Sequence, residues 1–115
     1  MLFICYPKCS TCKKAEQYLQ AKGLSFTMRD IKTDNPTVDE LRTWYAASGL
    51  PLKRFFNTSG NLYKQLGLKD KLPTMSEDEQ LELLASDGML VKRPLVIYDG
   101  GVLVGFKQAE YDEKL

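Results

Sequence analysis

The feature that most constrains the fold is the order of patterns in the first 31 residues. Residues 2–6 form a short apolar run rich in β-formers, and a helical pattern follows from about Ser10 to Lys22, ending at Gly23. The apolar positions of that helix are Cys12, Ala15 and Leu19. Residues 25–31 then alternate apolar and polar side chains, with Phe26 and Met28 on one face of a second strand. A crossover of this length makes the two strands parallel, with a right-handed connection and the helix packed on one face of the sheet.

Two Ser/Thr-x-x-Glu capping boxes predict helices in the middle of the chain. One box begins at Thr37 and its helix stops at Gly49, and the other begins at Ser76 and its helix extends to Gly88. Between them, residues 51–73 predict only short helical turns, at 52–56 and 62–66, broken by residues 57–60 and by Gly67.

The last part of the chain predicts a hairpin and a final helix. Residues 95–98 and 102–104 are short strands on either side of an Asp-Gly-Gly turn, and a helix covers about residues 108–115. The whole order predicts one α/β domain over residues 1–115, with a four-stranded mixed sheet flanked by helices. The helical middle, about 34–88, is an inserted lobe.

Composition excludes several classes of function. With 16 Lys+Arg against 15 Asp+Glu the net charge is +1, so we expect no direct binding to nucleic acid. No apolar stretch reaches the roughly 20 residues that span a bilayer, and no charged leader with a cleavage site begins the chain. We therefore expect a cytoplasmic protein without a membrane partner. Three cysteines are an odd count, which argues against a disulfide scaffold.

The pair Cys9 and Cys12 lies at the predicted junction of strand and helix. The unpaired N–H groups and the positive dipole end of a helix favour a thiolate, so we predict that Cys9 is a nucleophile. Lys8, Lys13 and Lys14 add positive charge nearby. Cys12, one turn along, is placed to resolve an intermediate by forming a disulfide. The alternative is that both are incidental buried thiols, as we expect for Cys5 within its apolar strand.

The chain contains no histidine. This absence removes Cys-His and Ser-His-Asp arrangements, and a lone Cys-x-x-Cys supplies only half of a tetrahedral zinc shell. We therefore predict no metal site, and the activation of Cys9 must come from the helix dipole and from cations.

Two arginines are candidate anion ligands. Arg93 precedes Pro94 directly before the strand at 95–98, where the proline could bring backbone against the thiol and the guanidinium could hold an oxyanion or thiolate. A solvated arginine beside an ordinary proline at the start of a strand is an equally open alternative. Arg54 is a weaker candidate, because a position on a solvated helix face is the favoured explanation for it.

Residues 6–15, with the sequence YPKCSTCKKA, resemble the active-site loop of the arsenate reductase (ArsC) family, which includes the Spx-type regulators. Residues 93–96 resemble that family's Arg-Pro motif at the start of a strand. The resemblance implies a thioredoxin-like, glutaredoxin-type fold with a cis bond before Pro94. It also implies Cys9 as the nucleophile and Arg93 as an oxyanion ligand, with Arg54 near another family arginine.

Two positions differ from the glutathione-dependent reductases of that family. Those enzymes generally carry a single cysteine in the loop, whereas this chain has a second one, Cys12. In this respect it resembles the Spx-type members, in which an internal disulfide is the redox event. The family's late arginine has no clear counterpart after the hairpin, where Lys107 offers a cation.

The sequence therefore supports two hypotheses. The first is a cytosolic thiol oxidoreductase of the arsenate reductase type, acting on a small oxyanion or a thiol/disulfide substrate. It needs no tightly bound cofactor and uses an external thiol reductant or redox partner protein: glutathione with glutaredoxin, or thioredoxin. Its predicted catalytic residues are Cys9, Cys12 and Arg93, and its predicted substrate-binding residues are Ser10, Thr11, Arg54, Arg93 and Pro94. The second is an Spx-type redox-sensing regulator that binds the RNA polymerase α subunit through a Cys9–Cys12 switch.

Overall fold

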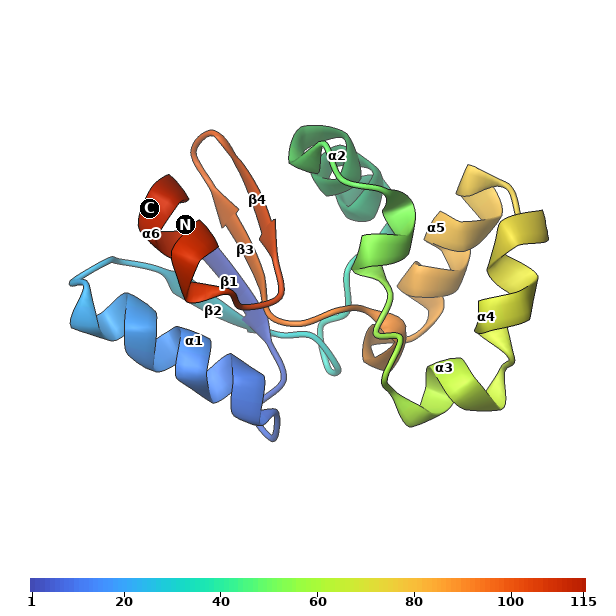
Figure 1. Cartoon of the computed structure of the whole chain (residues 1–115), viewed down its shortest axis with the longest axis horizontal. Helices are drawn as coiled ribbons and strands as arrows, with labels where there is room; N and C mark the ends of the chain where they lie inside the picture. Colours follow the sequence, from blue (N-terminus) through green and yellow to red (C-terminus); the bar gives the residue numbers. More distant parts are fainter.

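The computed structural model describes all residues 1–115, and a four-stranded mixed sheet forms its centre (Figure 1). The strands are β1 (Leu2–Cys5), β2 (Thr27–Asp30), β3 (Leu95–Tyr98) and β4 (Gly101–Val104), in the spatial order β2-β1-β3-β4. β1 pairs with β2 in parallel and with β3 antiparallel, and β3 and β4 form the hairpin. The sequence-based prediction of the sheet is confirmed.

Helices cover both faces of the sheet, because adjacent residues of a strand point to opposite faces. On one face, α1 (Ser10–Ala21) and α6 (Gln108–Lys114) pack in a cluster that contains Phe3 and Val96. On the other, α2 (Val38–Ser48) packs in a larger cluster that contains Ile4 and Leu95 and extends into the helical lobe. Figure 1 shows the lobe beside the sheet, along the longest dimension of the 42 × 27 × 25 Å molecule.

The sequence predicts three of the helical segments of the lobe, which are the turns at 52–56 and 62–66 and the helix that begins at Ser76, but not the other three. The lobe consists of six such segments. They are η1 (Leu52–Phe55), α3 (Asn61–Gln65), α4 (Leu68–Lys71), η2 (Leu72–Thr74), α5 (Glu77–Ser86) and η3 (Gly88–Leu90). Both predicted capping boxes are present, at Thr37 for α2 and at Ser76 for α5. The prediction that the α5 helix extends to Gly88 is wrong: the helix stops at Ser86 because Asp87 is extended, with a φ of −157°, and accepts a hydrogen bond from the Met89 N–H.

The second strand is shorter than its apolar alternation predicts, and its residue Met28 is not in the core. Met28 is 51% exposed, whereas Phe26, just before the strand, packs edge-on against Phe3 with ring centroids 5.5 Å apart. The reason is that β2 is an edge strand with β1 as its single neighbour, so the flanking elements cover it less completely. None of the helices is long and apolar enough to cross a membrane.

The capping box of α2 also carries an ion pair, which gives a prediction for stability. Arg29 donates to both carboxylate oxygens of Glu40, at 2.6 and 2.9 Å, and Glu40 accepts from the Thr37 N–H. Hydrogen bonds from the Arg29 guanidinium and then from the Thr37 N–H outweigh burial and lower the pKa of Glu40 to about 2. A depressed carboxyl pKa stabilises the fold above its unfolded pKa near 4.5, and this contribution is lost as the pH falls through about 2.

We therefore expect Glu40→Gln to lower the free energy of unfolding by about 1–2 kcal/mol at pH 7. The difference from the wild type should shrink as the pH is lowered from 5 toward 2, because the wild type then loses the same charge. Urea unfolding at several pH values measures the loss of stability at pH 7 and its change with pH. The control is Glu82→Gln, which alters an exposed carboxyl of α5. A difference that is constant with pH would contradict this account of the ion pair.

Candidate functional site

Cys9 and Cys12 lie at the start of α1, at the end of the loop that leaves β1. Cys9 is the N-cap residue, with an extended backbone, and its N–H donates to the Tyr6 carbonyl at 2.9 Å. Cys9 is partly exposed, whereas Cys12 is 2% exposed and packs with the core of the α1 face. The Tyr6 N–H donates to the Cys12 sulfur at 3.3 Å, so one residue of the loop fixes both cysteines.

The surroundings of Cys9 favour its thiolate. Burial raises the pKa of Cys9, but the backbone N–H groups of Cys12 and Thr11, the Cys12 thiol and the charge of Arg93 together lower it below the ordinary value. The N–H groups at the start of α1 therefore act on the pKa of Cys9 in the expected direction. The cation that contributes is Arg93, whereas the lysines that flank the two cysteines in sequence are exposed.

The other two cysteines are held as thiols. Burial, followed by the charge and hydrogen bond of Cys9, raises the pKa of Cys12 to about 12, although the Tyr6 N–H acts in the opposite direction. Burial likewise raises the pKa of Cys5 to about 11, and Cys5 is 3% exposed in β1. The three cysteines are free, and Cys9 is the one whose surroundings lower the pKa.

Arg93 is fixed against the cysteine loop by several contacts. Its guanidinium carbon lies 5.3 Å from the centre of the Tyr6 ring, and its Nη1 donates to the Met89 carbonyl at 3.3 Å. Its Nε is buried and has no hydrogen-bond partner. The Arg93–Pro94 peptide bond is cis, as the family resemblance implies, and Pro94 is buried at the start of β3.

Cys9 and Arg93 open into one cavity of about 380 Å³. Its lining is otherwise polar and comes from α1, from the turn before α3 and from the segment before β3: Thr11, Asn57, Ser59, Gly60, Asn61 and Lys92. A hydrogen-bonded pairing of two distant segments builds it. Phe56 and Val91 form an isolated bridge, flanked by bonds from the Asn57 N–H to the Leu90 carbonyl and from the Lys92 N–H to the Phe55 carbonyl.

The structure brings together some, but not all, of the residues predicted for the site. Cys9, Thr11 and Arg93 line the cavity, with Cys12 buried behind Cys9. Arg54, which was also predicted for the site, does not line the Cys9 cavity. It lines a neighbouring cavity of about 320 Å³, and Lys92 lines both cavities. Ser10 and Pro94 line neither cavity, and Lys107 is an exposed N-cap residue of α6.

Sequence reasoning missed Lys92, Asn57 and Asn61. Residues 57–60 are of types that are common in loops. No residue pattern near them indicates that this loop faces a cysteine 48 or more residues earlier in the chain. The position of Lys92 next to Arg93 was the one available signal.

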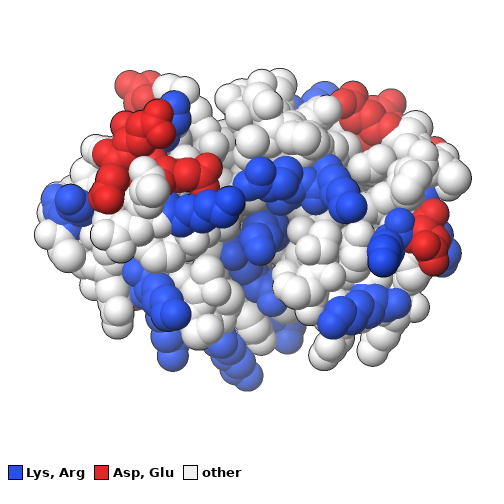
Figure 2. Space-filling view, in the orientation of Figure 1, with Lys and Arg blue, Asp and Glu red and all other residues white.

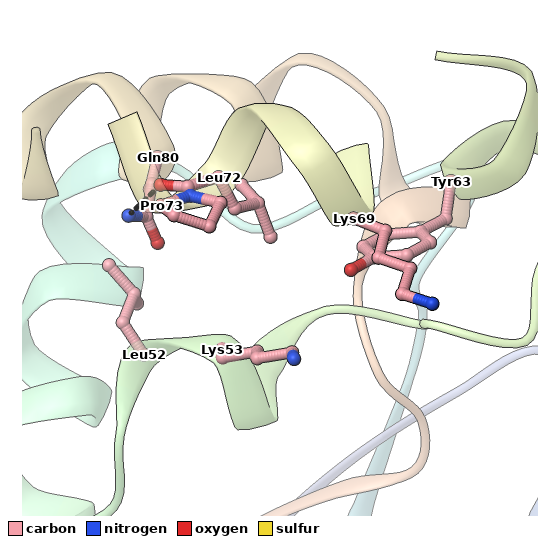
Figure 3. Close-up of a pocket in the computed structure, with 7 residues that line it drawn as sticks. All are labelled: Leu52, Lys53, Tyr63, Lys69, Leu72, Pro73 and Gln80. Atoms are coloured by element: carbon pink, nitrogen blue, oxygen red, sulfur yellow. Dashed lines mark hydrogen bonds between the residues drawn. The ribbon is translucent and has the colours of Figure 1, made fainter. Parts of the chain in front are cut away.

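A third cavity, of about 250 Å³, lies within the lobe (Figure 3). Leu52, Tyr63, Leu72 and Pro73 give it apolar walls, and Lys53 and Lys69 contribute cations. Gln80 donates to the carbonyls of Leu72 and Met75, so its amide has a structural role. No cysteine lines this cavity, and the structure contains no group of three or more His, Cys, Asp or Glu side chains placed to hold a metal ion.

The family model described as "ArsC family" matches residues 5–114. This chain belongs to the ArsC family. A putative ArsC family related protein from Bacteroides fragilis has 56% sequence identity and a TM-score of 0.95, over 97% of this chain and 94% of the other. A possible arsenate reductase from Streptococcus mutans has 47% identity and a TM-score of 0.90, over 99% and 97%. The thioredoxin-like fold of this ArsC protein is thereby confirmed.

Curated relatives of the chain include a regulator. The uncharacterized protein YusI of Bacillus subtilis is 52% identical over 113 residues, which are 98% of this chain and 96% of that protein. The regulatory protein MgsR of the same organism is 26% identical over 96% of this chain and 86% of its own length. The ArsC family thus includes both reductase-like and regulatory proteins among the relatives of this chain.

The role of Arg93 can be tested through the pKa of Cys9. In Arg93→Gln we expect a higher pKa, because one of the groups that stabilise the thiolate is removed. The pH dependence of alkylation by iodoacetamide, with the modified cysteine identified by peptide mass spectrometry, measures it. Lys13→Gln, which removes an exposed cation of α1, is the matched control and should leave the profile in place. Equal shifts in both variants would show that only general positive charge matters.

Proposed function

We propose that this ArsC protein is a cytoplasmic thiol oxidoreductase of the arsenate reductase type, with Cys9 as nucleophile and Cys12 as resolving thiol. The observation that carries the proposal is the lowered pKa of a cysteine that opens, together with Arg93, into a polar cavity. The likeness to the possible arsenate reductase from Streptococcus mutans supports it. An external thiol, from glutathione with glutaredoxin or from thioredoxin, would complete the cycle, and no tightly bound cofactor is required.

The first step is attack by the Cys9 thiolate on arsenic or on a disulfide sulfur. With arsenate, an As–S bond forms and an oxygen leaves as water, whereas with a disulfide the S–S bond breaks and a thiolate leaves and takes a proton. Arg93 and the N–H groups of Thr11 and Cys12 hold the negative charge in this step. Asn57 and Asn61 also line the cavity, and both can donate hydrogen bonds to an oxyanion.

The second step follows from the first through the charge of Cys9. Burial is the largest cause that raises the pKa of Cys12, and while Cys9 is a thiolate its charge and its hydrogen bond raise that pKa further. Once Cys9 is bonded to the substrate both effects disappear, and the Tyr6 N–H, which favours a Cys12 thiolate, remains. Cys12 then loses its proton and attacks the Cys9 sulfur. The products are a Cys9–Cys12 disulfide and either arsenite or the second substrate thiol, so the protein loses two electrons and the substrate gains two.

A single-turnover assay tests this function. Reduced protein, without any other thiol, should convert up to one equivalent of arsenate to arsenite, or of a small disulfide to its thiols. The Cys5→Ala variant should do the same, because Cys5 is buried and held as a thiol. Reduction of neither substrate by fully reduced protein would refute the proposal.

A second candidate is a redox-switched regulator that binds the RNA polymerase α subunit. The likeness to a protein described as a regulator favours it, and the helical lobe offers an interaction surface beside the cysteine cavity. Capture of the α subunit on immobilised protein, with the Cys9–Cys12 pair reduced or oxidised, separates the two functions. Binding that is absent or independent of the redox state would exclude the regulator.

A further inference from the structure

The cavity beside the Cys9 cavity has no role in the mechanism above. It measures about 320 Å³ and is lined by Lys53, Arg54 and Lys92. Lys92 lies between the two cavities, because it also lines the one that contains Cys9 and Arg93. The two cavities are therefore neighbours, and the second adds the cations Lys53 and Arg54 to the surroundings of the Cys9 cavity.

We propose that this second cavity binds the carboxylate-bearing arm of a small acidic disulfide, whose sulfur atoms lie at Cys9. The inference rests on the proposed thiol oxidoreductase function and names its substrate class. Each cavity has the size of a small-molecule site, for which about 300–1,000 Å³ is usual.

The charges of the two cavities are not neutralised by the protein. None of Lys53, Arg54, Lys92 and Arg93 takes part in an ion pair, although Arg29 and Arg42 elsewhere do. Neither cavity has an acidic residue in its lining. The chain as a whole carries only +1, so this concentration of unpaired positive charge is local. Figure 2 shows basic side chains gathered across the middle of one face, with the acidic ones mainly toward its edges.

An inorganic oxyanion alone does not account for this arrangement. Arsenate at Cys9 would meet Arg93 and Lys92 in the first cavity, and the two cations Lys53 and Arg54 would remain without a counter-charge. A carboxylate several bonds away from a disulfide sulfur places its charge beside them. Unpaired cations around a recess raise the local concentration of anionic substrates and disfavour cationic ones.

The reaction balances with the protein as reductant. The Cys9 thiolate attacks one sulfur of the acidic disulfide, the S–S bond breaks, and one acidic thiol leaves after taking a proton from water. Cys12 gives up its proton and attacks Cys9, and the second acidic thiol is released. One disulfide is reduced to two thiols for each Cys9–Cys12 disulfide formed.

The test compares three small disulfides in single turnover with reduced protein: dithiodipropionate, which carries two carboxylates, hydroxyethyl disulfide, which is neutral, and cystamine, which is cationic. Each rate is divided by the rate of the same disulfide with mercaptoethanol, which removes the difference in intrinsic reactivity. We expect the normalised rate of dithiodipropionate to exceed that of hydroxyethyl disulfide about tenfold or more, with cystamine slowest. Added salt should reduce the preference.

The double variant Lys53→Gln/Arg54→Gln should bring the ratio of acidic to neutral substrate close to one. Both side chains are exposed, so the fold should tolerate the change. Lys69→Gln is the matched control, because Lys69 lines the lobe cavity but neither of the other two, and should keep the full preference. Reaction of all three probes with Cys9 but without a preference for the acidic one, or a preference that the double variant keeps, would overturn the inference alone. Failure of all three probes to react with Cys9 would overturn the inference, and it would overturn the proposed function as well if the reduced protein does not reduce arsenate either.

Discussion

Replacement of Cys9 by serine should abolish the reduction of both arsenate and small disulfides, with a loss of at least about a thousandfold in rate. The hydroxyl of serine does not ionise at neutral pH, so the N–H groups of Thr11 and Cys12 would have no thiolate to stabilise. Stopped assays with excess dithiol as the recycling reductant measure the loss. Residual activity within tenfold of the wild type would show that Cys9 is not the nucleophile.

The matched variant is Cys12→Ser, which should still carry out the first step. Because the second step needs the Cys12 sulfur, this variant should accumulate a covalent adduct at Cys9 when it meets a disulfide. Intact-mass spectrometry would detect one bound substrate thiol in Cys12→Ser and none in Cys9→Ser. Circular dichroism should show that both variants are folded, since each change replaces one small side chain by another.

Replacement of Gly88 by alanine should destabilise the protein by about 3 kcal/mol or more. A Cβ atom at this position would overlap the carbonyl oxygen of Ile31 and lie 2.7 Å from its carbon. Backbone cannot move aside as a flexible side chain can, and Asn35, which is 3.3 Å from the same point, donates to the Ala85 carbonyl at 2.6 Å. The contact between Gly88 and Ile31 joins the lobe to the end of the β2 segment. We therefore expect the substitution to destabilise the whole domain and not the lobe alone.

Thermal unfolding measures the effect of Gly88→Ala, which should lower the melting temperature by at least about 10 °C. Gly101→Ala is the control, since the nearest atom to its added Cβ, at 2.9 Å, is the hydroxyl at the far end of the Tyr98 side chain. That side chain can turn away at little cost. Equal losses in the two variants would contradict the close packing of Gly88 against Ile31.

The parts of the fold that the sequence predicts are those set by residues close together in the chain. The capping boxes at Thr37 and Ser76 involve residues three positions apart, so the starts of α2 and α5 could be read directly. The prediction that Cys9 is a nucleophile also rests on local signals, because Cys9 and the N–H groups that favour its thiolate belong to one turn of the chain. The exposure of Met28 was not predictable in this way, since it depends on β2 being at the edge of the sheet.

The rest of the site depends on contacts between distant segments. Arg93 meets Cys9 because β3 pairs with β1, and Asn57 joins them because Phe56 pairs with Val91. The sequence placed positive charge at Lys8, Lys13 and Lys14, but the cation that lowers the pKa of Cys9 arrives from the other end of the chain. Residue spacing alone carries no information on such pairings, so Asn57 and Asn61 could not be assigned to the cavity.

The most direct test of the central claim is a redox titration of the wild-type protein against dithiothreitol buffers, with the bonded cysteines mapped by peptide mass spectrometry. We predict one reversible two-electron couple that links Cys9 to Cys12, leaves Cys5 reduced, and is absent from Cys9→Ser and Cys12→Ser. A chain in which Cys9 and Cys12 stay unlinked at every potential, or in which Cys5 takes part in the bond, would contradict the claim that Cys12 resolves an intermediate formed at Cys9.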